Sequence, residues 1–252
     1  MNEFGEMPAP VAPQPAPESQ DYPFWSYQDL VVLLGLALPV LLISALVVGF
    51  LAGLAGDAVS TPAVGVLGAQ FIAYALWFFC LWALIRFRYD RPFWRSLAWV
   101  NPPHPLTRYI ALGPVLAFTV GLTGALLRTP EAQMPMMELL QDRLSLVLVG
   151  VFAVTLGPIC EELAFRGFVL PLLTRSMGPV YAVLLTSVVF ALLHGPQYGW
   201  SWRHVLLITL ASAAFCVVRL RTGSTFAAAA MHMTYNLTFF IAYVAQENRF
   251  PI

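Results

Sequence analysis

The chain has 252 residues, of which 59% are hydrophobic and only 10% are charged, and its mean hydropathy is +0.75. Several apolar runs approach or exceed the about 20 residues that a helix needs to cross a bilayer core, so the composition excludes an ordinary soluble domain. The formal net charge is zero, which gives no electrostatic reason to expect a nucleic-acid partner. We therefore predict an all-α, polytopic helical membrane protein that has the lipid bilayer as its main surroundings.

The first 22 residues are rich in proline, acidic and almost free of aliphatic side chains. A segment of this kind cannot bury enough apolar surface to fold, and it is typical of a disordered tail. An aromatic cluster follows, of the type that lies at a membrane interface. We extend the predicted disordered tail through this cluster to residues 1–27, which include Tyr22, Phe24, Trp25 and Tyr27.

About seven transmembrane helices are predicted from the apolar segments that follow. They make up a single transmembrane helical domain over residues 28–246, and residues 247–252 form a short C-terminal tail. The predicted spans are residues 30–54, 64–85, 109–127, 146–173, 179–194, 204–221 and 225–245.

Two stretches between the spans predict short interfacial helices, because their apolar residues recur on one helical face. The first carries Phe93, Trp94 and Leu97, and the second carries Met136, Met137 and Leu140.

The distribution of arginines predicts the orientation, because cytoplasmic loops carry an excess of basic residues. If the loop 86–108 is cytoplasmic, nine arginines lie on or towards that side and four on the other. The N-terminus is then cytoplasmic and the C-terminus outside. Lysine is absent while alanine, leucine, proline and glycine are abundant, which favours a bacterial inner membrane as the location of this multi-pass cell-membrane protein.

Two adjacent glutamates, Glu161 and Glu162, lie within the apolar run of the fourth predicted span. Carboxylates at membrane depth are costly unless they are paired or hydrated, so they mark a functional site by default. Pro158 should kink or locally unwind the helix just before them. Glu162 and Arg166 are four residues apart and can form an ion pair, whereas Glu161 is rotated by about 100° and can face another helix.

Further polar residues on two later spans reach the same depth. His194 follows Phe190 by four residues, and Asn236 follows His232 by four. Measured at about 1.5 Å per residue, these side chains and the two glutamates converge near mid-membrane. A lone histidine or asparagine often serves as a contact between helices, and a Glu–Arg pair can simply fix their register. The common depth of the set favours a functional site, in which Phe190 shapes the pocket.

The predicted set permits water activation. A carboxylate with a neighbouring imidazole can deprotonate a water, while a second imidazole and a carboxamide can donate to an oxyanion. Alternatively, Glu161, His194 and His232 are side chains that could bind Zn²⁺. The sequence lacks an HExxH motif, so we predict no metal cofactor and keep zinc as the alternative.

Three ordered motifs carry a resemblance to a known family. They are Glu161-Glu162-Leu-Ala-Phe-Arg166, Phe190-xxx-His194 and His232-xxx-Asn236, all within a catalytic core at about residues 146–240. The chain resembles the CPBP family, the CAAX protease and bacteriocin-processing (Abi) intramembrane proteases similar to CAAX prenyl endopeptidases. In the eukaryotic prenyl endopeptidases the catalytic chamber opens toward the cytosol, which agrees with the distribution of arginines here.

The resemblance implies a hydrolase and a role for each motif residue. Glu161 with His194 would activate the nucleophilic water, His232 and Asn236 would stabilise the oxyanion, and Glu162 with Arg166 would support the site. Family members have been described both as glutamate-dependent proteases and as metalloproteases. The implied substrate is a peptide or protein, prenylated or otherwise tethered to the membrane.

A second class of function stays open from the sequence. The same polar cluster would suit a non-proteolytic membrane protein, such as a bacteriocin immunity or scaffold factor, or a carrier of small molecules or ions. A carrier is expected to show inverted repeats or paired broken helices. The sequence has one conspicuous helix break, at Gly157-Pro158, and no repeat, which favours the protease.

Overall fold

The computed structural model describes residues 22–55, 62–130 and 143–246, and within these ranges the chain is helical without strands. The predicted all-α class is confirmed. In chain order the elements are α1 (Tyr27–Ala55), α2 (Pro62–Ala83) with a π-helical extension η2 (Leu84–Arg88), α3 (Phe93–Ser96), α4 (Leu106–Leu126), α5 (Arg143–Val151), η4 (Phe152–Leu156), α6 (Gly157–Glu162), η5 (Leu163–Val169), α7 (Leu170–Leu193), η6 (Gly195–Tyr198), α8 (Trp202–Thr222) and α9 (Thr225–Gln246).

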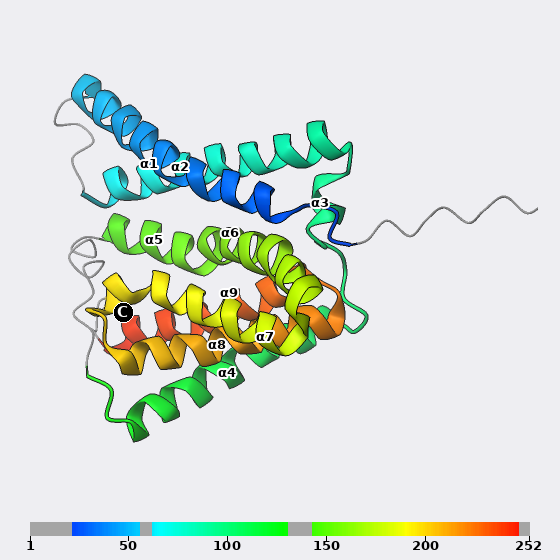
Figure 1. Cartoon of the computed structure of the whole chain (residues 1–252). Helices are drawn as coiled ribbons and strands as arrows, with labels where there is room; N and C mark the ends of the chain where they lie inside the picture. The colour runs from blue at the N-terminus through cyan, green and yellow to red at the C-terminus, as the bar shows by residue number, and fades with distance from the viewer. Residues whose placement is uncertain (1–21, 56–61, 131–142, 247–252) are drawn as a thin grey trace, which may run out of the picture.

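The helices form two groups with the glutamate-bearing stretch between them (Figure 1). Helices α1 and α2 pack together on one side, while α4, α7, α8 and α9 pack on the other. The continuous stretch from α5 to η5 lies between the groups and contacts both α2 and α9. Helices α4 and α9 approach closely at Gly113, where a side chain would meet the Thr234 hydroxyl and the backbone of Met231.

Five helical stretches are long and apolar enough to cross a membrane, compared with about seven predicted spans. Two causes explain the difference. The fourth and fifth predicted spans lie in one stretch, Arg143–Leu193, within which the chain reverses its direction at Gly178. Helix α9 matches the seventh predicted span in position, but its polar residues lower its hydropathy and it is not among the five. The described chain begins at one end of the bundle and α9 ends at the other (Figure 1).

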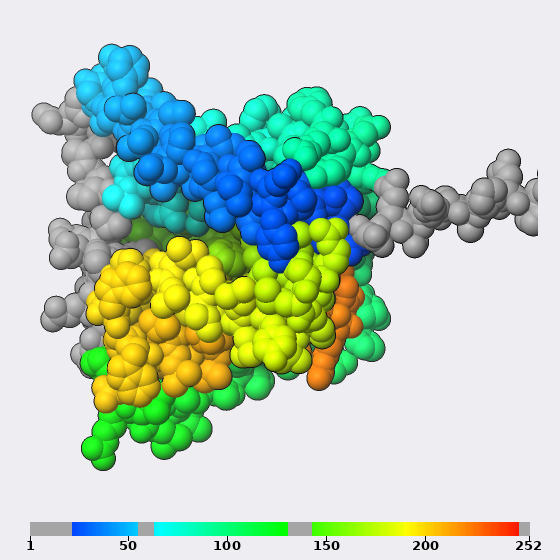
Figure 2. Space-filling model, in the orientation of Figure 1, coloured from blue at the N-terminus to red at the C-terminus, as the bar shows by residue number. Residues whose placement is uncertain are grey.

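The prediction of a disordered tail is wrong for its last six residues, 22–27. Trp25 is fully buried, stacks on Phe168 with ring centroids 5.1 Å apart, and donates its Nε1–H to the Phe168 carbonyl at 3.0 Å. The Arg175 guanidinium donates to the carbonyls of Pro23 and Trp25. Figure 2 shows this dark blue segment lying against the yellow-green start of α7. Trp25 therefore packs against η5, while Tyr22 and Tyr27 remain 48% and 43% exposed.

One predicted interfacial helix falls within the described residues. It is present as α3, but Leu97, which directly follows it, is fully buried in the cluster that contains Trp25 and Phe168. Of its predicted apolar face, Trp94 remains exposed. The predicted helix with Met136, Met137 and Leu140, residues 1–21 of the predicted tail and the C-terminal tail 247–252 lie outside the described residues.

Replacing Trp25 by phenylalanine tests whether this segment is part of the fold. The ring can still stack, but the Phe168 carbonyl loses its indole donor in a buried place, and we expect a loss of about 1–3 kcal/mol in unfolding free energy. Thermal unfolding of the detergent-purified protein measures the effect. The matched control is Trp202→Phe, at a tryptophan that is 61% exposed, which should leave the transition unchanged. Equal behaviour of the two variants would contradict the packed role of Trp25.

Candidate active site

The predicted ion pair between Glu162 and Arg166 is formed and completely buried. Arg166 Nη1 donates to Glu162 Oε1 at 2.8 Å, and both side chains are 0% exposed. The other guanidinium nitrogen, Nη2, donates to the carbonyl and the hydroxyl of Ser212 on α8, at 2.9 and 2.7 Å. Because a buried charge is stable only with such compensation, this pair is a fixed structural element of the site.

The backbone break predicted at Pro158 is also present, and it explains the position of Asn236. Residues 152–156 are π-helical, with the Gly157 N–H bonded to the Phe152 carbonyl five residues back. The same pattern would pair residue 158 with the Ala153 carbonyl, but proline has no N–H. Asn236 Nδ2 on α9 donates to that carbonyl instead, at 2.8 Å.

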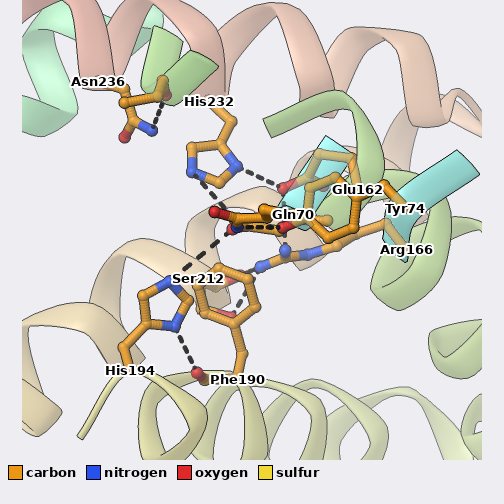
Figure 3. A network of polar contacts seen from close by, with 11 residues as sticks. Gln70, Tyr74, Glu162, Arg166, Phe190, His194, Ser212, His232 and Asn236 are labelled. Carbon is orange, nitrogen blue, oxygen red and sulfur yellow. Dashed lines mark hydrogen bonds and ion pairs between the residues drawn. The ribbon is translucent and has the colours of Figure 1, made fainter. Parts of the chain in front are cut away.

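Glu161 lies between the two histidines and is partly accessible. Its Oε1 is 3.9 Å from His194 Nε2, and its Oε2 is 3.8 Å from His232 Nε2. The side chains of Glu161 and His194 are both 24% exposed, in contrast to the fully buried Glu162. Figure 3 shows His194 and His232 approaching the Glu162–Arg166 pair from different helices. The two adjacent carboxylates therefore lie in different environments.

The hydrogen-bond partners of the histidines fix which ring nitrogen faces Glu161. His194 Nδ1 is 2.8 Å from the Phe190 carbonyl, and His232 Nδ1 is 2.9 Å from Glu162 Oε1. A carbonyl and a carboxylate accept hydrogen bonds, so Nδ1 is the donor in both rings. In its neutral form each ring then directs the lone pair of Nε2 towards Glu161. These acceptors can be joined by a molecule that donates hydrogens, and water is the simplest.

The comparison with protein families matches this part of the chain. Residues 143–238 match the family model of the Rce1-like type II CAAX prenyl endopeptidases. We call residues 143–238 the Rce1-like segment. The resemblance to CAAX proteases that the three motifs carry is confirmed over this segment. Searches of curated proteins and of solved structures give no match.

The Rce1-like segment contains every predicted site residue, and the structure brings most of them into contact. Glu161, Glu162, Arg166, His194 and His232 form one connected network. The other two hold their places differently. Phe190 packs its ring 4.5 Å from that of His194 and 4.8 Å from the Arg166 guanidinium, while the contact of Asn236 is with the backbone of η4.

Two residues of α8 belong to the site and were not predicted from the sequence. Phe215 stacks on His232 at 4.4 Å and lies 5.4 Å from the guanidinium of Arg166. Ser212 accepts two hydrogen bonds from Arg166, through its carbonyl and its hydroxyl oxygen. Their spacing of three residues places them on one helical face, which was the available signal. Serine and phenylalanine are ordinary in a membrane span, so the signal was weak.

An apolar groove of about 400 Å³ lies beside the glutamates. Residues outside the Rce1-like segment form one of its walls, and residues within that segment form the other. Helices α2 and α3 provide one wall and the stretch from η4 to η5 provides the other. The groove is lined by Phe71, Tyr74, Ala75, Phe78, Phe79, Trp82, Phe93, Trp94, Leu156, Ile159, Cys160 and Leu163. Tyr74, which lines the groove, interacts electrostatically with Glu161, so the groove lies beside the site.

Tyr198 in η6 is a further neighbour of the site. Burial raises the pKa of its phenol, and the negative charge of Glu161 adds to the effect. The ring stacks on His204 with centroids 4.8 Å apart. The phenol therefore stays neutral and can act only as a hydrogen-bonding group.

The zinc alternative concerns Glu161, His194 and His232. These are donor types that zinc uses, at about 2.0–2.2 Å from the ion. Within residues 22–55, 62–130 and 143–246, no group of three or more His, Cys, Asp or Glu side chains is arranged to hold a metal ion. As placed here, the three side chains do not fit a metal-binding group.

Proposed function

We propose that the protein is an intramembrane endopeptidase in which Glu161 activates the water that attacks the scissile peptide bond. The observation that carries this proposal is the placement of Glu161 opposite the Nε2 atoms of His194 and His232, at 3.9 and 3.8 Å. Such separations are too long for direct hydrogen bonds and suit groups that share one water. As the water oxygen attacks the carbonyl carbon, its proton passes to the Glu161 carboxylate.

The remaining polar side chains suit stabilisation of the oxyanion. His232 donates Nδ1–H to Glu162, so its ring can take up a proton at Nε2 and then donate from that atom. Asn236 uses one amide hydrogen on the Ala153 carbonyl and keeps the second. When the tetrahedral intermediate collapses, the carbon–nitrogen bond breaks and the proton on Glu161 passes to the leaving amine.

The groove supports a substrate that carries a large apolar group, such as a prenylated or membrane-tethered peptide. Its lining is almost wholly aromatic and aliphatic, and its volume of about 400 Å³ is in the usual range of ligand pockets. Because Cys160 lines the groove and precedes Glu161, an apolar group bound there would bring the attached peptide to the carboxylate.

A peptide-cleavage assay tests the proposal. The purified protein in liposomes is given a fluorogenic peptide with a farnesylated CAAX end, or the same peptide without the farnesyl group, and mass spectrometry identifies the bond that is cut. We expect faster cleavage of the farnesylated peptide and no cleavage by His194→Ala. EDTA should leave the rate unchanged, because the proposed water is held by side chains.

Three results would count against parts of this proposal. Loss of activity in EDTA with recovery on addition of Zn²⁺ would replace the side-chain-held water by a metal-bound one. Equal cleavage of both peptides would remove the prenylated substrate. Absence of cleavage of either peptide, with the folded protein in hand, would favour a non-proteolytic role as an immunity or scaffold factor or as a carrier.

A further inference from the structure

Tyr74 and Gln70 on α2 form a polar pair at the edge of the site, outside the Rce1-like segment. Gln70 Nε2 donates to the Tyr74 hydroxyl oxygen at 3.2 Å. The Tyr74 ring stacks on Phe152 with centroids 5.8 Å apart and planes inclined by 16°. Figure 3 shows both side chains beside the buried network. Two independent contacts therefore hold the phenol in one orientation.

The hydroxyl hydrogen of Tyr74 is available to a substrate. Since the oxygen accepts from Gln70, its own hydrogen points elsewhere. No acceptor for that hydrogen is found among the described residues, which comprise 22–55, 62–130 and 143–246. The phenol interacts electrostatically with the Glu161 carboxylate, and it also lines the apolar groove. Tyr74 thus lies where the groove meets the proposed base.

A peptide bound along the groove would need hydrogen-bond donors for its carbonyl oxygen. The donors supplied by α9 are partly committed, because Asn236 already donates one amide hydrogen to Ala153 and His232 donates Nδ1–H to Glu162. A pre-oriented neutral donor in a water-poor site is effective in stabilising developing negative charge. The phenol of Tyr74 has these properties.

We propose that Tyr74, oriented by Gln70, is a further catalytic residue that donates its phenolic hydrogen to the carbonyl oxygen of the scissile bond. This inference rests on the proposed endopeptidase function. It assigns part of the active site to α2, which the family match does not cover. The alternative is that Tyr74 only packs α2 against η4 through its stacking on Phe152.

Tyr74→Phe separates the two roles, because phenylalanine keeps the stacking ring and loses only the hydroxyl. Removal of one oxyanion donor typically lowers kcat by about 10²–10³-fold. We expect a loss in this range with little change in KM, measured on the farnesylated peptide in liposomes. Gln70→Leu should give a smaller loss in kcat, since the hydroxyl remains but is no longer held.

Two control variants make the comparison specific. Tyr181→Phe removes a hydroxyl from a tyrosine that is 67% exposed on α7, and its kcat should equal that of the unmodified protein. Tyr198→Phe tests the other phenol that interacts with Glu161. A wild-type kcat in Tyr74→Phe, or a loss confined to Tyr198→Phe, would overturn the role of Tyr74 and leave the proposed function standing. Absence of cleavage by the unmodified protein would overturn both.

Discussion

Glu161→Gln is expected to abolish peptide-bond cleavage while leaving the folded protein intact. The amide cannot accept the proton of the attacking water, and a positioned general base contributes about 10²–10⁴-fold to a rate. Glu161 is 24% exposed and contacts His194 and His232, whereas the fully buried Glu162 is paired with Arg166, so replacing Glu161 leaves that buried pair intact. Loss of activity should therefore occur without loss of stability.

The measurement is the cleavage rate of the farnesylated peptide together with the thermal unfolding curve. Asp90→Asn is the matched control, because it makes the same chemical change at a carboxylate that is 86% exposed and belongs to a surface pair with Arg86. Its rate should equal that of the unmodified protein. Cleavage by Glu161→Gln at an undiminished rate would remove Glu161 from the chemistry. The inactive variant should also retain uncleaved substrate, so mass spectrometry of co-purified peptides can identify natural partners.

Glu162→Ala is expected to destabilise the protein by about 3–5 kcal/mol, the usual cost of leaving one member of a buried ion pair without its partner. Both Glu162 and Arg166 are 0% exposed, so water cannot replace the missing carboxylate. The variant also removes the acceptor for His232 Nδ1, so any protein that folds should have lost activity as well. Thermal unfolding in detergent measures the first effect and peptide cleavage the second.

The chain offers a close control for this experiment. Arg86 and Asp90 form an Arg–carboxylate pair with the same spacing of four residues, but their side chains are 51% and 86% exposed. Surface pairs of this type contribute little, so Asp90→Ala should leave the unfolding temperature almost unchanged. If Glu162→Ala and Asp90→Ala unfold alike, burial of the first pair does not determine its contribution.

The parts of the site that follow from helix periodicity could be predicted from the sequence. The pairing of Glu162 with Arg166 needs only the spacing of four residues, and the opposite exposure of Glu161 follows from the rotation between neighbours. The break at Pro158 follows from its missing N–H. Each of these depends on residues close together in the chain.

Contacts between helices that are distant in the chain could not be predicted from the sequence. Nothing in the pattern indicated that Asn236 would bond to the Ala153 carbonyl or that Ser212 would hold Arg166, because both contacts depend on how α9 and α8 pack. The packing of Trp25 could not be predicted for the same reason, because an aromatic residue near an interface can face lipid or protein. Trp25 faces protein because it contacts Phe168, which lies 143 residues later in the chain.

The reversal of the chain at Gly178 sets the relative heights of Glu161 and His194. Its backbone has φ +80°, which side-chain-bearing residues rarely adopt, and helix runs in both directions away from it. Glu161 lies seventeen residues before this point and His194 sixteen after it, so two nearly equal arms bring the carboxylate and the imidazole to the same level. One residue inserted in either arm would shift its end by about 1.5 Å and turn it by about 100°. We therefore expect the two arms to tolerate substitutions better than changes in length.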